Sequence, residues 1–425
     1  MVCRILVTVK QYVKENPMED KVPQPDQSWL VAVRRDLHRH PELSYQEKRT
    51  SEKVADILSE LGYRVRRDVA KTGVVATLGD SKRPCLAFRA DMDALPIQES
   101  ESRLNASYRS VYDGVMHACG HDAHTTIMLG VAKVLAENLE LLDRSGICVK
   151  FIFQPAEEGG AGARQMIEEG ALDSPRPRAL LAGHMYSDLE IGWAGVSESL
   201  SHASADRFRI RVIGRGGHGA RPHQCRDPIV AASYLVNQLQ TIVSRWIDAT
   251  DSAVVTVGRI AGGSAFNVIP AEVETDGTIR SFREETRQLI WDRIEAVARS
   301  CEMGFDVSCK AEREEGYPPC VNDIEVSRFL REISSDLLGV DRVKIMEPSM
   351  GAEDFAFYAS IVPGAMIRLG CANRSKGICW DQKNDSVIGL HSPNFDIDEE
   401  VLSIGVRIFT LLAMRADHLS YVRGE

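Results

Sequence analysis

The stretch CLAFRADMD at residues 85–93 combines a short, mostly apolar run with two acidic residues, Asp91 and Asp93, at its end. An apolar run of this length between turn signals is typical of a buried strand. Similar patterns predict strands at 73–78, 146–153 and 179–182, and helices at 125–141 and 44–62. Ser44 followed three residues later by Glu47 predicts a capping box at the start of the second of these helices. Strands that alternate with helices favour an α/β domain whose sheet is covered on both faces.

Polar side chains follow three of the predicted strands. They are Asp91 and Asp93, Glu157 and Glu158, and His184. Ligands of α/β sheets gather at the carboxyl ends of the strands. The sequence therefore predicts a functional site at that edge.

The densest group of potential metal ligands is MHACGHDAH at residues 116–124. Gly120 separates Cys119 from His121 and lets the backbone aim both side chains at one point. A Cys-Gly-His unit on a loop suits an open metal site, whereas a zinc finger builds a closed site from spaced ligand pairs. Any one of these residues alone is more often an ordinary core residue. The cluster as a whole predicts metal ligation, and His391, in a turn-rich loop before a final helix, is a weaker candidate.

Glu157 and Glu158 are adjacent carboxylates in a Gly-rich turn. Such a pair is usually solvated surface charge, because like charges repel each other. Beside a cation, one carboxylate can bind the ion while its neighbour accepts a proton from water. With Cys119, His121 and His184 available, the second interpretation is favoured.

The middle of the chain has its own pattern. Strand, helix, strand, strand, helix and strand follow one another between residues 204 and 314, the order of a ferredoxin-like unit. Such a unit can be inserted into a host domain. We therefore expect an N-terminal extension at 1–25 with little order, a catalytic domain formed by 26–203 and 315–425, and an inserted domain at 204–314.

The glycines of GRGGHG at 214–219 match a dinucleotide-binding pattern by letter. However, a loop containing Arg221-Pro222-His223 separates them from the next helix, and no acidic residue ends the next strand, so a dinucleotide site is rejected. The favoured interpretation is that the glycines allow the loop that carries His218 to approach another surface closely.

Composition limits the partners and the location. The 425 residues carry a net charge of −10, and no basic stripe overrides it, so neither nucleic acid nor an anionic membrane is an expected partner. No segment approaches a membrane span or a complete signal peptide. Ten scattered cysteines suggest reduced thiols. We expect a cytoplasmic protein.

The motifs together resemble one family of enzymes. They recur in the same order at His38–Leu43, Arg89–Pro96, His117–His124, Gln154–Gly159, Gly216–His223, Asn267–Pro270, Gly277–Arg280, Ala352–Phe355 and His391–Pro393. The chain is similar to metal-dependent amidohydrolases of the aminoacylase and carboxypeptidase-G-like superfamily. The branch is that of hippurate hydrolases, N-acyl-L-amino-acid amidohydrolases and indole-acetyl-amino-acid hydrolases. The resemblance extends from about Trp29 to the last helix.

The resemblance implies an α/β fold with two domains and a role for several residues. Two divalent ions, zinc or manganese, would be held by Cys119, His121, Glu158, His184 and His391. Glu157 would be the general base, and Asn267 and Arg280 would contact the substrate. The inserted domain would be a lid and a dimerisation surface, with His218 reaching the neighbouring subunit of a homodimer or a higher homo-oligomer. Asp93 is expected to orient a ligand imidazole, because metal-bound histidines usually donate their other nitrogen to a carboxylate.

Three functions stay open at this point. The first is hydrolysis of N-acyl amino acids, in which the acyl group is not specified by the sequence. The second is a dipeptidase or carboxypeptidase activity of the same superfamily, and the third is a metal-stabilised binding protein without catalysis. A serine hydrolase is not expected, because the sequence has no G-x-S-x-G elbow.

Overall fold

The computed structural model of the chain describes residues 22–102 and 104–424, and these form two compact units. Among the described residues, the first unit comprises 22–102, 104–198, 322–346 and 361–424, and the second comprises 199–321 and 347–360. Most of the expected N-terminal extension at 1–25 lies outside the described residues. Val22, which is described, is buried in the core of the first unit.

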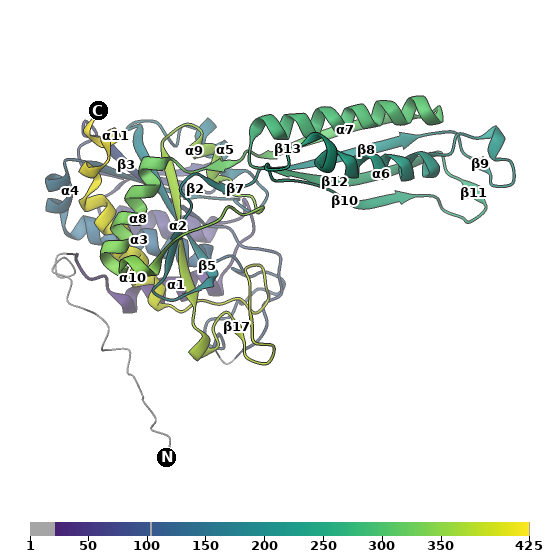
Figure 1. Ribbon diagram of the computed structural model, residues 1–425. Helices are drawn as coiled ribbons and strands as arrows, with labels where there is room; N and C mark the ends of the chain where they lie inside the picture. Colours follow the sequence, from purple (N-terminus) through teal and green to yellow (C-terminus); the bar gives the residue numbers. More distant parts are fainter. Residues whose placement is uncertain (1–21, 103, 425) are drawn as a thin grey trace, which may run out of the picture. The chain divides into compact units, whose positions relative to one another are not determined.

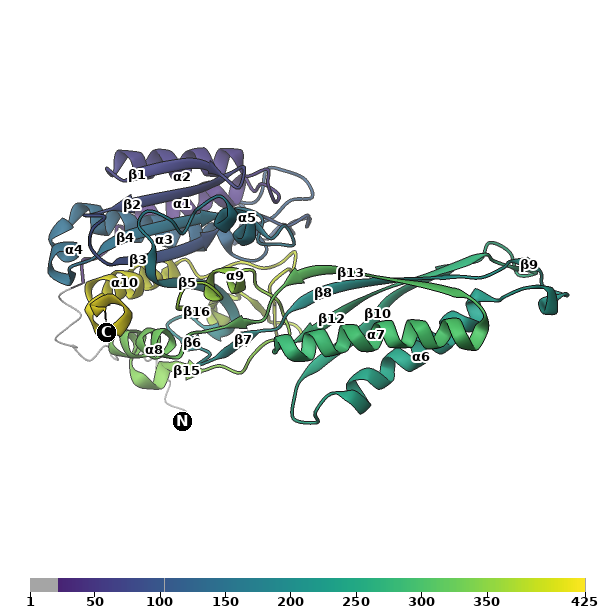
Figure 2. The ribbon, with the colours of Figure 1, turned by 90° about the horizontal axis from the view of Figure 1, so that it is seen from above.

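The first unit is built on an eight-stranded mixed sheet (Figures 1 and 2). In spatial order the strands are β1 (Arg64–Val69), β2 (Gly73–Leu78), β4 (Cys148–Gln154), β3 (Cys85–Asp91), β5 (Pro177–Glu190), β16 (Gly364–Ala372), β6 (Ala194–Val196) and β15 (Val343–Ile345). The four central strands, from β4 to β16, run parallel. Every residue of β3, β4 and β16 is buried, as expected for parallel strands covered on both faces.

Helices complete the first unit. They are α1 (Gln27–Arg39), α2 (Lys48–Glu60), α3 (His121–Glu137), α4 (Leu139–Ser145), α5 (Gly162–Glu168), α8 (Ile324–Leu338), α10 (Glu400–Met414) and α11 (Ser420–Arg423), beside a small ribbon of β17 (Trp380–Asp381) and β18 (Ser386–Val387). Glycine lets three helices pack closely, because a Cβ on Gly130 of α3 would lie 2.5 Å from Val406 of α10 and 2.7 Å from Leu30 of α1. Helix α3 is thereby held between two neighbours.

Several local predictions differ from the structure. Helix α3 begins at His121 and not near 125, so the Cys-Gly-His unit is a helix start, with Gly120 as its N-cap residue. Strand β5 continues to Glu190 because it pairs with β16 beyond the point where its pairing with β3 ends. The capping box is wrong: the Ser44 hydroxyl donates to Asp93, and Glu47 accepts from the Tyr45 backbone N–H.

The second unit contains a four-stranded antiparallel sheet, in the order β10-β12-β8-β13, with two helices. Along the chain the elements are β8 (Ala205–Ile213), α6 (Pro228–Trp246), β10 (Ala253–Gly262), β12 (Glu272–Ser281), α7 (Glu284–Phe305) and β13 (Ser308–Tyr317). Alternate residues of β8, Phe208, Ile210 and Val212, are buried in a separate core with both helices. Shorter elements are β7 (Leu200–His202), β9 (Gly217–His218), β11 (Val268–Ile269), β14 (Cys320–Val321) and α9 (Phe355–Ala359).

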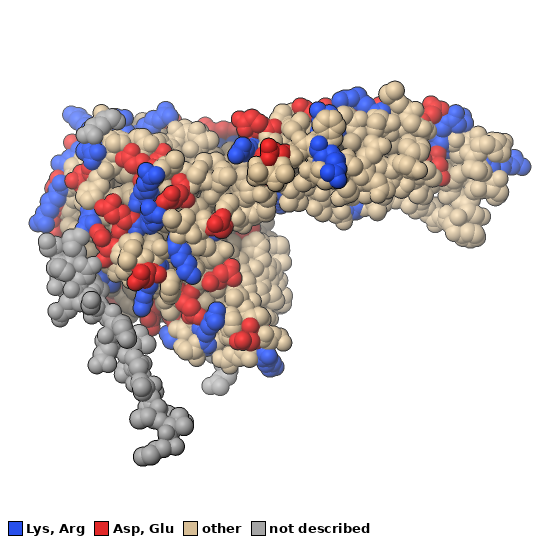
Figure 3. Space-filling view, viewed as in Figure 1, with Lys and Arg blue, Asp and Glu red and all other residues tan. Residues whose placement is uncertain are grey.

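The described surface carries mixed charges. Figure 3 shows lysine and arginine interspersed with aspartate and glutamate over the face in view. Among the described helices, none combines the length and the apolar character that crossing a membrane would require.

Candidate metal centre

The structure brings the five predicted metal ligands together in the first unit. Cys119, His121 and His184 form one group of potential ligand atoms that all lie within 4.8 Å of one another, and Cys119, Glu158 and His391 form another. The thiol of Cys119 belongs to both groups. The cluster therefore offers two adjacent ligand sets that meet at one sulfur atom.

The spacing of these atoms fits a metal ion. A tetrahedral zinc ion with ordinary bond lengths separates its sulfur and nitrogen ligands by roughly 3.6 Å and a nitrogen and an oxygen by roughly 3.3 Å. Cys119 Sγ lies 3.6 Å from His184 Nε2, and His391 Nε2 lies 3.1 Å from Glu158 Oε1. His121 Nε2 is buried and has no hydrogen-bond partner among the described residues. An orphaned nitrogen beside a thiol and a carboxylate is what a ligand set without its cation would show.

Gly120 explains how two ligands one residue apart face the same point. Its φ is +86°, a left-handed conformation that glycine adopts freely, and it immediately precedes the first turn of α3. His121 is then fixed by the helix, and its Nδ1 lies 3.3 Å from Asp93 Oδ1. This distance is compatible with the predicted role of Asp93 as a carboxylate that orients a ligand imidazole.

Asp93 also holds the loop that carries Glu157 and Glu158. Its two carboxylate oxygens accept one backbone N–H each from these residues, both at 3.0 Å. The preceding Ala156 has a φ of +53°, and its N–H donates to Glu47 at 2.9 Å. Three consecutive backbone donors are therefore bound by two buried carboxylates. This places the Glu157 carboxylate within 4.8 Å of ligand atoms of His121 and Glu158.

His184 and His391 are fixed by backbone groups. His184 Nδ1 donates to the carbonyl of Met185 at 2.7 Å, which leaves Nε2 without its hydrogen and facing Cys119. His391 has a φ of +62°, and its N–H donates to the carbonyl of Ala118 at 2.8 Å. That bond ties a late loop directly to the Cys-Gly-His segment.

The protonation of the cluster without a cation follows from its charges. Burial lowers the pKa of His121, but Asp91 and Asp93 outweigh this effect and raise it well above its usual value. Cys119 and Glu158 raise the pKa of His391 to about 10. Burial raises the pKa of the Cys119 thiol. A divalent cation that binds here would displace these protons, so its affinity would rise with pH.

Three predicted site residues lie in the second unit. His218 is exposed on β9, and the N–H of the next residue, Gly219, donates to the carbonyl of Asn267 at 2.8 Å. A Cβ on Gly219 would lie 2.9 Å from that carbonyl, so the glycine permits the close approach of the two loops. Arg280 stands eight residues beyond Glu272 on β12, roughly 26 Å along the strand, while Glu272 pairs with Ile213 just before the His218 loop. Within one second unit, Arg280 and His218 are therefore at opposite ends.

The sequence reasoning missed Glu47 as part of the site. Its carboxylate accepts from Ala156 N–H and from the hydroxyl of Thr72 at 2.6 Å. The only available signal, its spacing from Ser44, indicated a helix cap. Its true partners come from residues that are remote in the chain.

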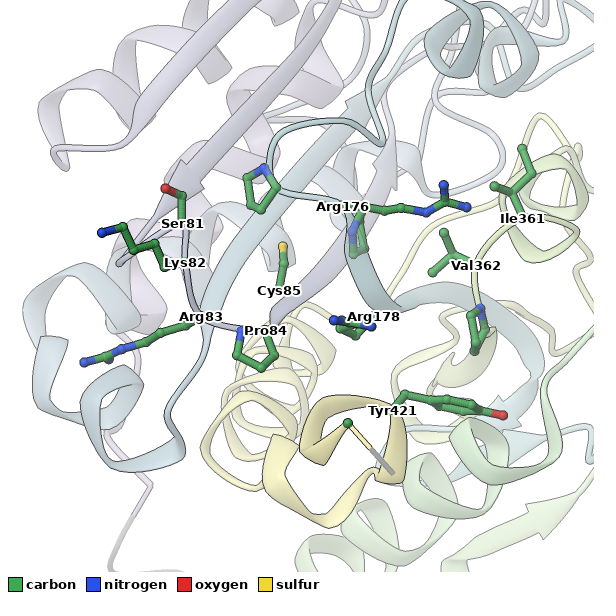
Figure 4. Close-up of a pocket in the computed structure, with 14 residues that line it drawn as sticks. Ser81, Lys82, Arg83, Pro84, Cys85, Arg176, Arg178, Ile361, Val362 and Tyr421 are labelled. Carbon is green, nitrogen blue, oxygen red and sulfur yellow. The ribbon is translucent and has the colours of Figure 1, made fainter.

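A separate cavity of about 750 Å³ lies at the amino ends of β3, β5 and β16. It contains none of the predicted site residues, and its lining includes four cations and no carboxylate: Lys82, Arg83, Arg176 and Arg178. Figure 4 shows that Lys82 and Arg83 extend to one side, whereas Arg178 lies between Pro84 and Tyr421. The candidate metal centre is at the opposite edge of the strands, where sheets of this type bind ligands.

Comparison with known proteins identifies the family of the chain. The sequence profile of peptidase family M20/M25/M40 matches residues 87–415. IAA-amino acid hydrolase ILR1-like 4 of Arabidopsis thaliana is 39% identical over 391 residues, which are 91% of this chain and 85% of the relative. N-acetyl-L-cysteine deacetylase of Bacillus subtilis is 38% identical over 376 residues, 88% and 84% of the two chains. The crystal structure of a dinuclear metal-binding peptidase of the M20 family from Bacillus subtilis is 34% identical with a TM-score of 0.76, covering 92% of this chain and 98% of that one. The chain therefore belongs to peptidase family M20/M25/M40 and is an amidohydrolase of that family.

Proposed function

We propose that the protein hydrolyses the amide bond of N-acyl amino acids with two divalent ions, zinc or manganese, and releases a carboxylic acid and a free amino acid. The observation that carries this proposal is the convergence of two ligand groups at Cys119 with Glu157 beside them. The names of the relatives support the substrate class, since one is an IAA-amino acid hydrolase and another an N-acetyl-L-cysteine deacetylase.

The residues divide the chemistry between them. Divalent ions held by Cys119, His121, Glu158, His184 and His391 supply, when bound, a more acidic water and a polarised amide carbonyl. The Glu157 carboxylate takes a proton from the attacking water and delivers it to the leaving nitrogen. Asp93 keeps the Glu157 backbone in place for this transfer through a hydrogen bond of 3.0 Å. His218 would donate to the developing oxyanion and Arg280 would bind the carboxylate of the amino acid.

Glu157→Gln tests the base directly. We expect the variant to bind as much metal as the wild type and to lose turnover by about 10²–10⁴-fold, because the amide keeps the shape and cannot accept the proton. Metal content and the rate of hydrolysis of acetyl, benzoyl and indole-acetyl amino acids are the two measurements. If Glu157→Gln keeps the full wild-type kcat, Glu157 is not the general base.

The same panel separates the proposal from a dipeptidase or carboxypeptidase. We expect N-acyl amino acids to be hydrolysed with a higher kcat/KM than dipeptides, which carry a free amino group. A preference for dipeptides would replace the proposed substrate class. Metal binding without hydrolysis of either class would instead indicate a binding protein.

A second copy of the chain is part of the proposal. Strand β10 is one edge of the second-unit sheet and has a single charged residue, Arg259, whereas the other edge, β13, carries five: Lys310, Glu312, Arg313, Glu314 and Glu315. Charged side chains protect an edge strand from pairing, and β10 lacks this protection. Exposed Ile229, Phe266 and Val268 line a hollow of about 530 Å³ near the end of β10. A homodimer joined at β10 would cover this edge.

The position of Arg280 supports a shared site. Arg280 and His218 lie at opposite ends of one second unit, roughly 26 Å apart along β12. The two residues cannot contact one small substrate from the same unit. If both act on it, they must come from different subunits, and the homodimer supplies the second one.

A further inference from the structure

Another buried group of potential ligands shares His121 with the candidate metal centre. Asp91, His121 and His124 place ligand atoms within 4.8 Å of one another, which by itself would suit another cation. The hydrogen bonds of His124 exclude that use. Its Nε2 accepts the backbone N–H of Met185 at 2.8 Å, and its Nδ1 lies 2.6 Å from Asp91 Oδ1.

These contacts determine the tautomer of His124. A backbone N–H can only donate, so Nε2 must carry no hydrogen. The neutral ring then has its hydrogen on Nδ1, which donates to Asp91. Nδ1 carries the hydrogen and the lone pair of Nε2 accepts the Met185 N–H, so neither nitrogen has a free lone pair for a metal ion.

Asp91 is itself held in place. Arg89 Nη1 donates to its second carboxylate oxygen at 2.7 Å, and Arg89 Nε donates to Gln154 Oε1 at 2.9 Å. The hydroxyl of Thr125 donates to the backbone carbonyl of Asp91 at 2.8 Å. All three hydrogen bonds are buried, so the Asp91 carboxylate is a fixed acceptor for His124.

At the other end of this chain of hydrogen bonds, Met185 is held on three sides. Its N–H is bound by His124, its carbonyl accepts from His184 Nδ1, and its side chain lies against Gly120, where a Cβ would be 2.7 Å from Met185 Cγ. The carbonyl of Met185 sets the orientation of the His184 ring. The His124 and His184 rings also pack together, with centroids 4.6 Å apart.

We propose that Asp91 and His124 form a hydrogen-bond relay that fixes the Met185 backbone and thereby orients the metal ligand His184. His124 is a positioning residue for one of the two ions, the one bound by the group of Cys119, His121 and His184. This inference rests on the proposed function for its effect on metal binding. His124 and Asp91 thus position a metal ligand and do not bind the metal ion themselves.

A pair of substitutions separates the two ends of the relay. In His124→Asn the side-chain amide reaches where Nδ1 was, so it can donate to Asp91 but leaves the Met185 N–H without an acceptor. In His124→Gln the amide oxygen reaches where Nε2 was and can accept from Met185. Thr126→Val is the control, because that buried hydroxyl on the same helix donates only to the Asp122 carbonyl.

The first readout is zinc content at a series of buffered free-zinc concentrations. We expect His124→Asn to bind one of the two ions 10–100-fold more weakly, while His124→Gln and Thr126→Val stay within about threefold of the wild type. Wild-type affinity for both ions in His124→Asn would overturn the relay. Equal weakening in the Asn and Gln variants would also overturn it, because the acceptor for Met185 would then be irrelevant.

The second readout needs no metal. Hydrogen exchange of the metal-free proteins should show faster exchange of the Met185 amide in His124→Asn than in the wild type, with protection restored in His124→Gln. Unchanged exchange in His124→Asn would refute the relay even if two ions bind. A wild type that binds no zinc would refute the proposed function, while the exchange measurement would still decide the relay.

Discussion

At the scale of single residues, Gly120 carries two separate requirements: a φ of +86° and space for Met185. Gly62 has a similar φ of +82°, but a Cβ there would meet nothing within 4 Å. Gly62→Ala should therefore cost only the backbone term, about 1–2 kcal/mol in the free energy of unfolding. Gly120→Ala should cost more, because Met185 must move, and should weaken metal binding at least tenfold. Urea titrations and zinc content of both variants are the measurements, and equal behaviour of the two variants would contradict this assignment.

At the scale of elements, His38 links α1 to the first turn of α3. Its Nδ1 lies 2.8 Å from Asp122 and its Nε2 3.2 Å from Glu99. Burial and Arg34 lower the pKa of His38, but Asp122 and Glu99 outweigh them and raise it from 6.5 to about 9. Because the pKa is raised in the folded protein, protonated His38 adds to the free energy of unfolding. This contribution is fully present below pH 6.5 and is lost as the pH rises through about 9. This contribution is about 3 kcal/mol at most.

The pH dependence of stability tests this link. The free energy of unfolding of the metal-free wild type should fall between pH 6.5 and 9.5, and the part due to His38 should be missing in His38→Gln. Urea titrations of both proteins across this range give the difference. A constant difference between them would show that His38 does not titrate in the folded protein.

Individual strands and ligands also show how much of the structure local sequence patterns could predict. Both ends of strand β2 were predicted correctly, because a short apolar run begins at Gly73 and ends before Gly79. The true end of β5 depends on pairing with β16, which comes about 180 residues later and leaves no local sign. The candidate ligands could be named because Cys119 and His121 stand in a dense group of potential ligands, and because Glu158 and His184 follow predicted strands. Their hydrogen-bond partners, such as Glu47 for Ala156, depend on rotamers and long-range packing that no local pattern encodes.

At the scale of the whole molecule, the shared site can be tested by mixing two inactive variants. His218→Ala and Glu157→Gln homodimers should each be inactive. An equal mixture forms about half heterodimers, and each heterodimer has one complete site if His218 acts across subunits, so activity should return to about a quarter of the wild-type value. If activity does not return after the subunits have exchanged, His218 acts in the site of its own subunit or takes no part in the reaction.

The proposed interface has its own test at this scale. Ile260→Lys puts a charge on the β10 edge and should shift the protein from the mass of two chains to that of one in light scattering. Met303→Lys is the matched control, since Met303 is also an exposed apolar side chain and lies on α7. A dimer that survives Ile260→Lys but not Met303→Lys would place the interface on the helix.

The insertion of the second unit within the first also orders events during synthesis. The ribosome completes the sheet of the second unit at Tyr317, while the first unit still lacks β16, α10 and His391. At 5–20 residues per second, the remaining 74 residues to His391 take about 4–15 s. The sheet of the second unit can therefore fold on the nascent chain, whereas the first unit gains His391, the last of the proposed metal ligands, only later.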